Sequence, residues 1–92
     1  MRQDRAEMVG LQALAHLAAE DDLIGAFLAA TGADMAGVRA QAAEPAFLGA
    51  VLDFLLQEDR WVIGFAEAAG LHPAEVAEAR AALPGGQHPH WT

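Results

Sequence analysis

The chain has 92 residues, no cysteine, no lysine, five arginines and thirteen acidic residues, which gives a formal net charge of −8. This composition excludes disulfides, cysteine nucleophiles and thiolate metal sites, and it disfavours nucleic acids and anionic membranes as partners because an acidic surface repels phosphate. Hydrophobic residues make up 54% of the chain, and much of that share is alanine, so the sequence favours one small helical domain over a sheet.

The N-terminal stretch and the hydropathy indicate a cytoplasmic protein. The opening "MRQDRAE" lacks the basic and then apolar order of a signal peptide. The longest uncharged run spans residues 8–19 and is shorter than the ~18 apolar residues that a membrane-spanning helix needs. We therefore expect a soluble cytoplasmic domain with no membrane segment.

Three helices are predicted in the first half of the chain. The first covers about residues 5–20, and Asp4 with Glu7 has the spacing of a capping box at its start. The second ends at Gly32, where a left-handed residue stops a helix, and Asp34 then takes the N-cap position of the third. The apolar stripe of the second helix consists of Leu23, Ile24, Phe27, Leu28 and Thr31.

A fourth helix is predicted to begin at Pro45, a favoured first helical residue, and to continue through Gln57. It is apolar nearly all round and is interrupted by Asp53, so we expect it to form the buried centre of the domain. The domain is predicted to span residues 1–86, and residues 87–92 are predicted to form a flexible C-terminal tail.

The second half of the chain repeats the first at an offset of 38 residues. Residues 14–43 align with residues 52–81 without a gap, and ten of the thirty pairs are identical. Gly70 again stops a helix, and His72, Pro73 and Glu75 form the start of the next. We predict an all-α fold, a compact bundle of five to six short helices in two pseudo-repeated three-helix halves. A solenoid is disfavoured because it usually needs three or more repeats.

An acidic pair lies at the first corner of each half. Glu20 with Asp21, and Glu58 with Asp59, are placed to cap the N–H groups of the helix that follows. Paired carboxylates also serve as acid and base or bind hard cations, but capping explains the same positions in both halves. No catalytic residue and no cofactor is assigned to these acids.

The remaining chemistry of the sequence does not favour an enzyme. Thr31 and Thr92 are the only hydroxyl residues, so Ser–His or Cys–His catalysis has no nucleophile. His88 and His90 form a pair in the tail next to Trp91, but a metal site needs three or four converging ligands. We predict no enzymatic activity and no metal site.

The stretch "AEAAGLHPAEV" has the spacing of a DNA-binding helix-turn-helix motif. The residues with that spacing are Ala66, Gly70, Leu71 and Val76. The helix that would read bases offers one arginine and several acids, which suits a structural turn better than nucleic acid. A nucleic-acid-binding protein remains the alternative function, and it would use Arg39, Arg60 and Arg80.

The leading functional hypothesis is a non-enzymatic protein–protein interaction module that binds another protein or a second copy of itself. Trp61 is large where its repeat partner Leu23 is smaller, and tryptophan is favoured at binding hot spots. Phe54 and Leu56 widen the apolar surface of the fourth helix beyond a single stripe. The candidate partner interface therefore comprises Trp61, Phe54 and Leu56.

Three stretches also carry a resemblance to a known family: "LQALAHLAAEDDLIGAFLAATG", "EPAFLGAVLDFLLQED" and "FAEAAGLHPAEVAEARAALPG". Over about residues 11–85 the chain resembles a family of small bacterial helical proteins catalogued only as a domain of unknown function. The resemblance implies an all-helical intracellular domain and supplies no catalytic residues.

Overall fold

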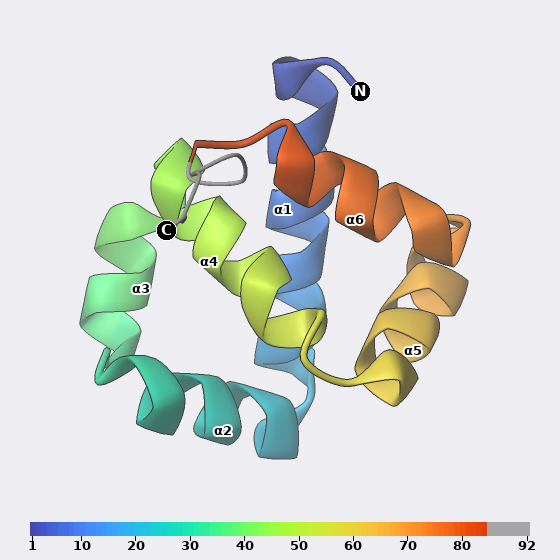
Figure 1. Ribbon diagram of the computed structural model, residues 1–92. Helices are drawn as coiled ribbons and strands as arrows, with labels where there is room; N and C mark the ends of the chain where they lie inside the picture. Colours follow the sequence, from blue (N-terminus) through green and yellow to red (C-terminus); the bar gives the residue numbers. More distant parts are fainter. Residues whose placement is uncertain (85–92) are drawn as a thin grey trace, which may run out of the picture.

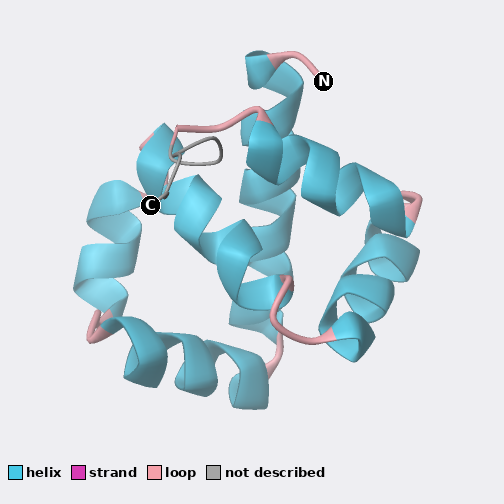
Figure 2. Cartoon of the chain, in the orientation of Figure 1, coloured by secondary structure: helices cyan, strands magenta, loops and turns pink. Residues whose placement is uncertain are grey.

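The computed structural model describes residues 1–84, which form six α-helices and no strand (Figures 1 and 2). The all-α prediction is therefore confirmed. The predicted tail, with His88, His90 and Trp91, lies outside the described residues. The helices are α1 (Gln3–Ala19), α2 (Asp21–Thr31), α3 (Met35–Gln41), α4 (Pro45–Leu55), α5 (Asp59–Ala69) and α6 (Pro73–Ala81).

The core of the bundle lies between α1 and α4, and α6 packs against both helices. In Figure 1, α4 and α6 pass in front of α1, while α3 lies on the opposite side of the view from α5. Val51, Leu52 and Leu55 of α4 are fully buried, as expected for a central helix. This helix ends at Leu55 rather than at the predicted Gln57.

A glycine sets how closely α1 and α4 approach. Gly10 is buried in the middle of α1, and a Cβ atom added there would lie 2.8 Å from the Cβ of Leu48 on α4. Real Cβ atoms do not approach so closely, so only glycine fits at this crossing. The absence of a side chain at Gly10 lets the two central helices pack at short range.

The predicted helix ends at the two turn glycines are confirmed. Gly32 and Gly70 end α2 and α5 with φ of 74° and 71°, in the left-handed region that favours glycine. After the second turn, the Leu71 N–H donates to the carbonyl oxygen of Ala66 at 2.8 Å. Asp34 caps α3 as predicted, because its Oδ1 accepts from the Gly37 N–H at 2.8 Å.

The capping predicted for the other acids is wrong. Glu20 and Glu58 occupy the N-cap positions of α2 and α5, but neither side chain makes a cap hydrogen bond. Glutamate is not among the short side chains that prefer this position, and the Glu58 carboxylate pairs instead with Arg60 at 3.4 Å. Asp21 and Asp59 still lie in the first helical turn, where the helix dipole favours an acid.

The capping box predicted from Asp4 and Glu7 is also wrong. α1 begins two residues earlier than expected, at Gln3, so Asp4 lies inside the helix and Arg2 takes the N-cap position. Glu7 instead accepts a hydrogen bond from Gln3 Nε2 at 3.0 Å. The first turn is therefore held by contacts along the helix surface rather than by a side-chain cap.

The two halves of the sequence repeat pack differently. α6 contacts α1, α4 and α5 and buries Val76 and Ala79, whereas the shorter α3 buries Val38. α2 buries Phe27, and its counterpart α5 buries Val62, Phe65 and Ala66. The structure therefore does not confirm that the two halves repeat in three dimensions, and this part of the fold stays a prediction.

Among residues 1–84, no single helix is long and apolar enough to cross a membrane. Within the same residues, α2 and α3 together reach the required length, but they are bent by 84° at the break between them.

Candidate functional site

Trp61 is held in place by an aromatic stack at the start of α5. Its ring lies 4.8 Å from the ring of Phe54 on α4, with 18° between the two planes. Phe54 is 5% exposed, and its ring also meets Phe27 edge to face at 5.4 Å. Phe54 is thus a core residue that supports the indole, and Trp61, which is half-buried, keeps part of its surface open to solvent.

Trp61 lines a cleft of about 400 Å³ between the start of α2 and the start of α5. We call this the Trp61 cleft, and its lining residues are Glu20, Asp22, Leu23, Arg60 and Trp61. The sequence did not predict that the start of α2 lies beside the start of α5. The internal repeat could have indicated this contact, because its alignment pairs Leu23 with Trp61, and these two residues line the same cleft.

Of the three predicted interface residues, only Trp61 lines this cleft: Phe54 supports it from the core, and Leu56 lies outside it. Its side chain is half-buried and packs against the hydrophobic core. The three predicted residues therefore separate into a half-buried ring in the cleft (Trp61), its buried support (Phe54) and a peripheral core contact (Leu56).

The cleft combines an aromatic ring with charges of both signs. The guanidinium carbon of Arg60 lies 5.8 Å from the centroid of the Trp61 ring, which is the range of a cation–π contact. Arg60 also pairs with Glu58, and its side chain is largely exposed. Glu20 and Asp22 add two carboxylates to the lining. The two carboxylates outnumber the single guanidinium of Arg60, whose charge Glu58 also balances, so the site can hold a further cationic group with an apolar stem.

A second, more apolar groove of about 320 Å³ lies between α1 and α5. His16 and Phe65 contribute rings whose centroids are 5.6 Å apart. The lining residues are Gln12, Ala15, His16, Phe65, Ala68 and Ala69. No catalytic pair of side chains is formed by this set, and we refer to it below as the α1–α5 groove.

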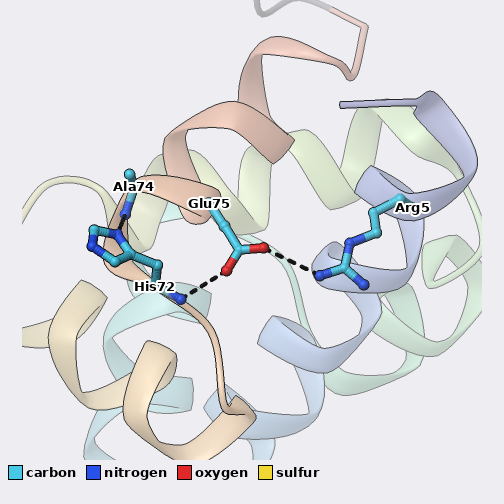
Figure 3. Close-up of polar contacts among 4 residues, drawn as sticks. All are labelled: Arg5, His72, Ala74 and Glu75. Atoms are coloured by element: carbon cyan, nitrogen blue, oxygen red, sulfur yellow. Dashed lines mark hydrogen bonds and ion pairs between the residues drawn. The ribbon is translucent and has the colours of Figure 1, made fainter.

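The start of α6 is tied to α1 by a network of polar contacts (Figure 3). Glu75 Oε2 accepts from the His72 N–H at 2.8 Å, and His72 Nδ1 accepts from the Ala74 N–H at 3.1 Å. The predicted capping box of His72 and Glu75 is therefore confirmed. The other oxygen of Glu75 accepts from Arg5 Nη2 on α1 at 3.3 Å.

The hydrogen bond from the backbone N–H of His72 lowers the pKa of Glu75 below its ordinary value of 4.5, and Arg5 lowers it further. Partial desolvation of the carboxyl opposes this shift. Both donors stabilise the ionised carboxylate, so the folded state favours the charged form. These contacts cap α6 and tie its start to α1, which is a structural role.

The variant Glu75→Gln is expected to melt at a lower temperature than the wild type at neutral pH. Because the folded pKa is lowered, the carboxylate stabilises the fold fully above the unfolded pKa, and this contribution is lost as the pH falls through the folded pKa. The difference in Tm between the two proteins should therefore shrink at acidic pH. Melting curves from neutral to acidic pH measure it, with Glu78→Gln on the same helix as the control. A difference that stays constant on acidification would contradict this account.

The helix-turn-helix spacing corresponds to a real tight turn, but Arg80, the arginine of its second helix, is already paired within the domain. Ala66 and Val76 are buried on either side of the Gly70 turn, as that spacing requires. Arg80 donates from Nε to Asp53 Oδ1 at 2.6 Å and from Nη1 to the Pro84 carbonyl oxygen at 2.9 Å, which leaves its side chain 15% exposed.

The three arginines of the nucleic-acid alternative lie on three different helices. Arg39 is on α3, Arg60 is in the first turn of α5, and Arg80 is on α6. Since α3 and α5 lie on opposite sides of the view in Figure 1, the fold separates Arg39 from Arg60. In the described part of the chain, no group of three or more His, Asp or Glu side chains is arranged to hold a metal ion.

The chain matches a protein-family model over most of its length. No curated protein and no solved structure matches the chain. The model of the family described as "Protein of unknown function (DUF3572)" matches residues 3–86, which include all six helices. The match covers most of the chain, and the chain therefore belongs to the DUF3572 family.

Proposed function

We propose that the protein is a non-enzymatic protein–protein interaction module, and that the Trp61 cleft receives a lysine or arginine side chain of its partner. The observation that carries the proposal is the position of Trp61, half-buried on the Phe54 ring and open to a cleft. An indole already fixed by packing loses little freedom on binding, and buried tryptophan dominates many interfaces.

The charge of the cleft supports a cationic ligand group. The methylene stem of a lysine or arginine packs against Trp61 and Leu23, and its charged end reaches the carboxylates of Glu20 and Asp22. The net charge of −8 acts in the same direction, because it steers a basic partner segment toward the domain.

The nucleic-acid alternative has weaker support. Its turn geometry is present, but Arg80 is engaged by Asp53 and Pro84, and Arg60 is engaged by Glu58 and the Trp61 ring. Binding a phosphate backbone would require an extended basic surface. The acidic composition argues against such a surface.

Capture of a partner is expected to depend on Trp61 and not on nucleic acid. The immobilised wild type should retain a protein from a lysate of the source organism after nuclease treatment, and Trp61→Ala should retain it at least ~10-fold less well, as for a hot-spot residue. Quantitative mass spectrometry of the bound fraction measures this. Ile63→Ala, an exposed apolar position on the same helix, is the matched control and should bind like the wild type.

A second variant and a folding check separate loss of the cleft from loss of the fold. Asp22→Asn removes a cleft carboxylate without disturbing the Phe54 stack, so it should weaken capture even though the core is intact. Circular dichroism checks that each variant is folded. Binding that survives both substitutions would refute the role of the cleft, and binding that disappears on nuclease treatment would favour the helix-turn-helix alternative.

A further inference from the structure

The outward side of α1 carries large apolar side chains that no described helix covers. Met8 is 58% exposed and Leu11 is 46% exposed, although α1 contributes its opposite side to the core. Ala15 and Ala18 follow on the same side and are also exposed. We call these four residues the outer stripe of α1.

The outer stripe has the spacing of a coiled-coil seam. Its members, Met8, Leu11, Ala15 and Ala18, are separated by three, four and three residues, which is the alternation of a and d positions in a heptad repeat. No acidic or arginine residue occurs between Glu7 and Glu20. On a chain with a net charge of −8, this helix surface is therefore one on which two copies meet without strong repulsion.

The stripe is complementary in size to itself when two copies run antiparallel. Its large side chains lie in the N-terminal half of α1 and its alanines in the C-terminal half. Antiparallel pairing sets Leu11 opposite Ala15 of the second copy, and Met8 opposite Ala18. Each large side chain then faces a small one, which fills the seam evenly along its length, whereas parallel pairing sets large against large and leaves gaps between the alanines.

The charges at the two ends of α1 favour the same orientation. Arg2 and Arg5 lie at its start, and the acidic corner at residues 20–22 follows its end. With Leu11 opposite Ala15, Arg5 of one copy comes near Asp21 of the other. Arg5 is half-exposed while paired with Glu75, so it can contribute further hydrogen bonds. Parallel pairing would instead bring the two acidic corners together.

We infer that the protein forms a two-fold symmetric homodimer through the outer stripe of α1, with the two α1 helices antiparallel. Leu11 of the second copy then lies over Ala15, at the edge of the α1–α5 groove, so the groove extends the contact beyond a single helix. This interface does not include Trp61, although the acidic corner at residues 20–22 that it approaches also contributes Glu20 and Asp22 to the Trp61 cleft. The inference goes beyond the proposed function and does not depend on it.

Self-association is tested by sedimentation equilibrium over a concentration series. The apparent mass of the wild type should rise with concentration from the monomer value of 9.6 kDa to twice that value. Leu11→Glu should remain monomeric because it places a carboxylate of each copy in the seam. Ile63→Glu is the matched control, since Ile63 is 47% exposed and lies outside the stripe and the groove, and it should dimerise like the wild type. A wild type that stays monomeric, or a Leu11→Glu variant that dimerises normally, would refute the inference.

The orientation of the two α1 helices is tested by disulfide crosslinking, in which only the introduced cysteines can react because the chain has no native cysteine. Leu11→Cys and Ala15→Cys are mixed in equal amounts and oxidised. Antiparallel pairing should yield mainly the mixed disulfide, since it brings these two positions together. Predominance of the two homodisulfides would overturn the antiparallel arrangement. Trp61→Ala should dimerise normally, so failure of this inference and failure of the cleft proposal give different results.

Discussion

Phe27→Ala is expected to lower the free energy of unfolding by about 3–5 kcal/mol, the usual cost of deleting a buried aromatic side chain. Phe27 is fully buried and is the residue by which α2 is anchored in the core. Its ring meets Phe47 at 5.9 Å and Phe54 at 5.4 Å, both edge to face. Truncation removes both ring contacts and leaves a cavity beneath α2.

The expected loss is a large share of the stability of so small a domain, for which a total of ~5–15 kcal/mol is typical. Because Phe54 supports Trp61, the substitution should also loosen the Trp61 cleft. Urea unfolding followed by circular dichroism measures the effect. Ile63→Ala removes an exposed apolar side chain and should change stability by no more than ~0.5 kcal/mol. A loss below about 1 kcal/mol for Phe27→Ala would contradict the assigned packing.

Gly10→Ala is expected to destabilise the protein, although alanine is the better helix former. Replacing glycine by alanine inside a helix ordinarily stabilises it by ~0.5–1 kcal/mol. Here the new Cβ would lie 2.8 Å from the Cβ of Leu48, an atom fixed to the backbone of α4 that no rotamer change can move away. Relief requires α1 and α4 to separate, and overpacking of this kind costs ~1–3 kcal/mol.

The control for this prediction is Gly25→Ala on α2, where an added Cβ meets nothing within 4 Å. Gly25 is exposed and helical, so the same substitution should raise stability there by ~0.5–1 kcal/mol. The two variants are thus expected to change the urea midpoint in opposite directions. A Gly10→Ala variant that is more stable than the wild type would show that α1 and α4 are not in such close contact.

Local signals explain why most helix boundaries were predicted correctly from the sequence. The left-handed turn at Gly70 and the His72–Glu75 capping box join residues that are at most a few positions apart. Their chemistry therefore does not depend on the rest of the fold. Where the local preference was weak, as for the glutamates at Glu20 and Glu58, the capping prediction failed.

The candidate site could be predicted only in part. The identity of Trp61 and its place at a helix start were visible in the sequence. Stacking on Phe54, and the meeting of Leu23 and Asp22 with Trp61 in one cleft, depend on how α2, α4 and α5 pack. The sequence also gave no sign that Arg80 turns inward to Asp53, which removes it from any basic surface.

The sequence by itself determined that the chain is helical, where most helices stop, and that α4 is central, because propensity, caps and apolar periodicity act within one or two turns. Only the tertiary structure decided which residues share a surface. It brought the starts of α2 and α5 together in one cleft and left Met8 and Leu11 exposed on α1. Contacts between residues far apart in the chain follow from the geometry of helix packing, and no local pattern encodes that geometry.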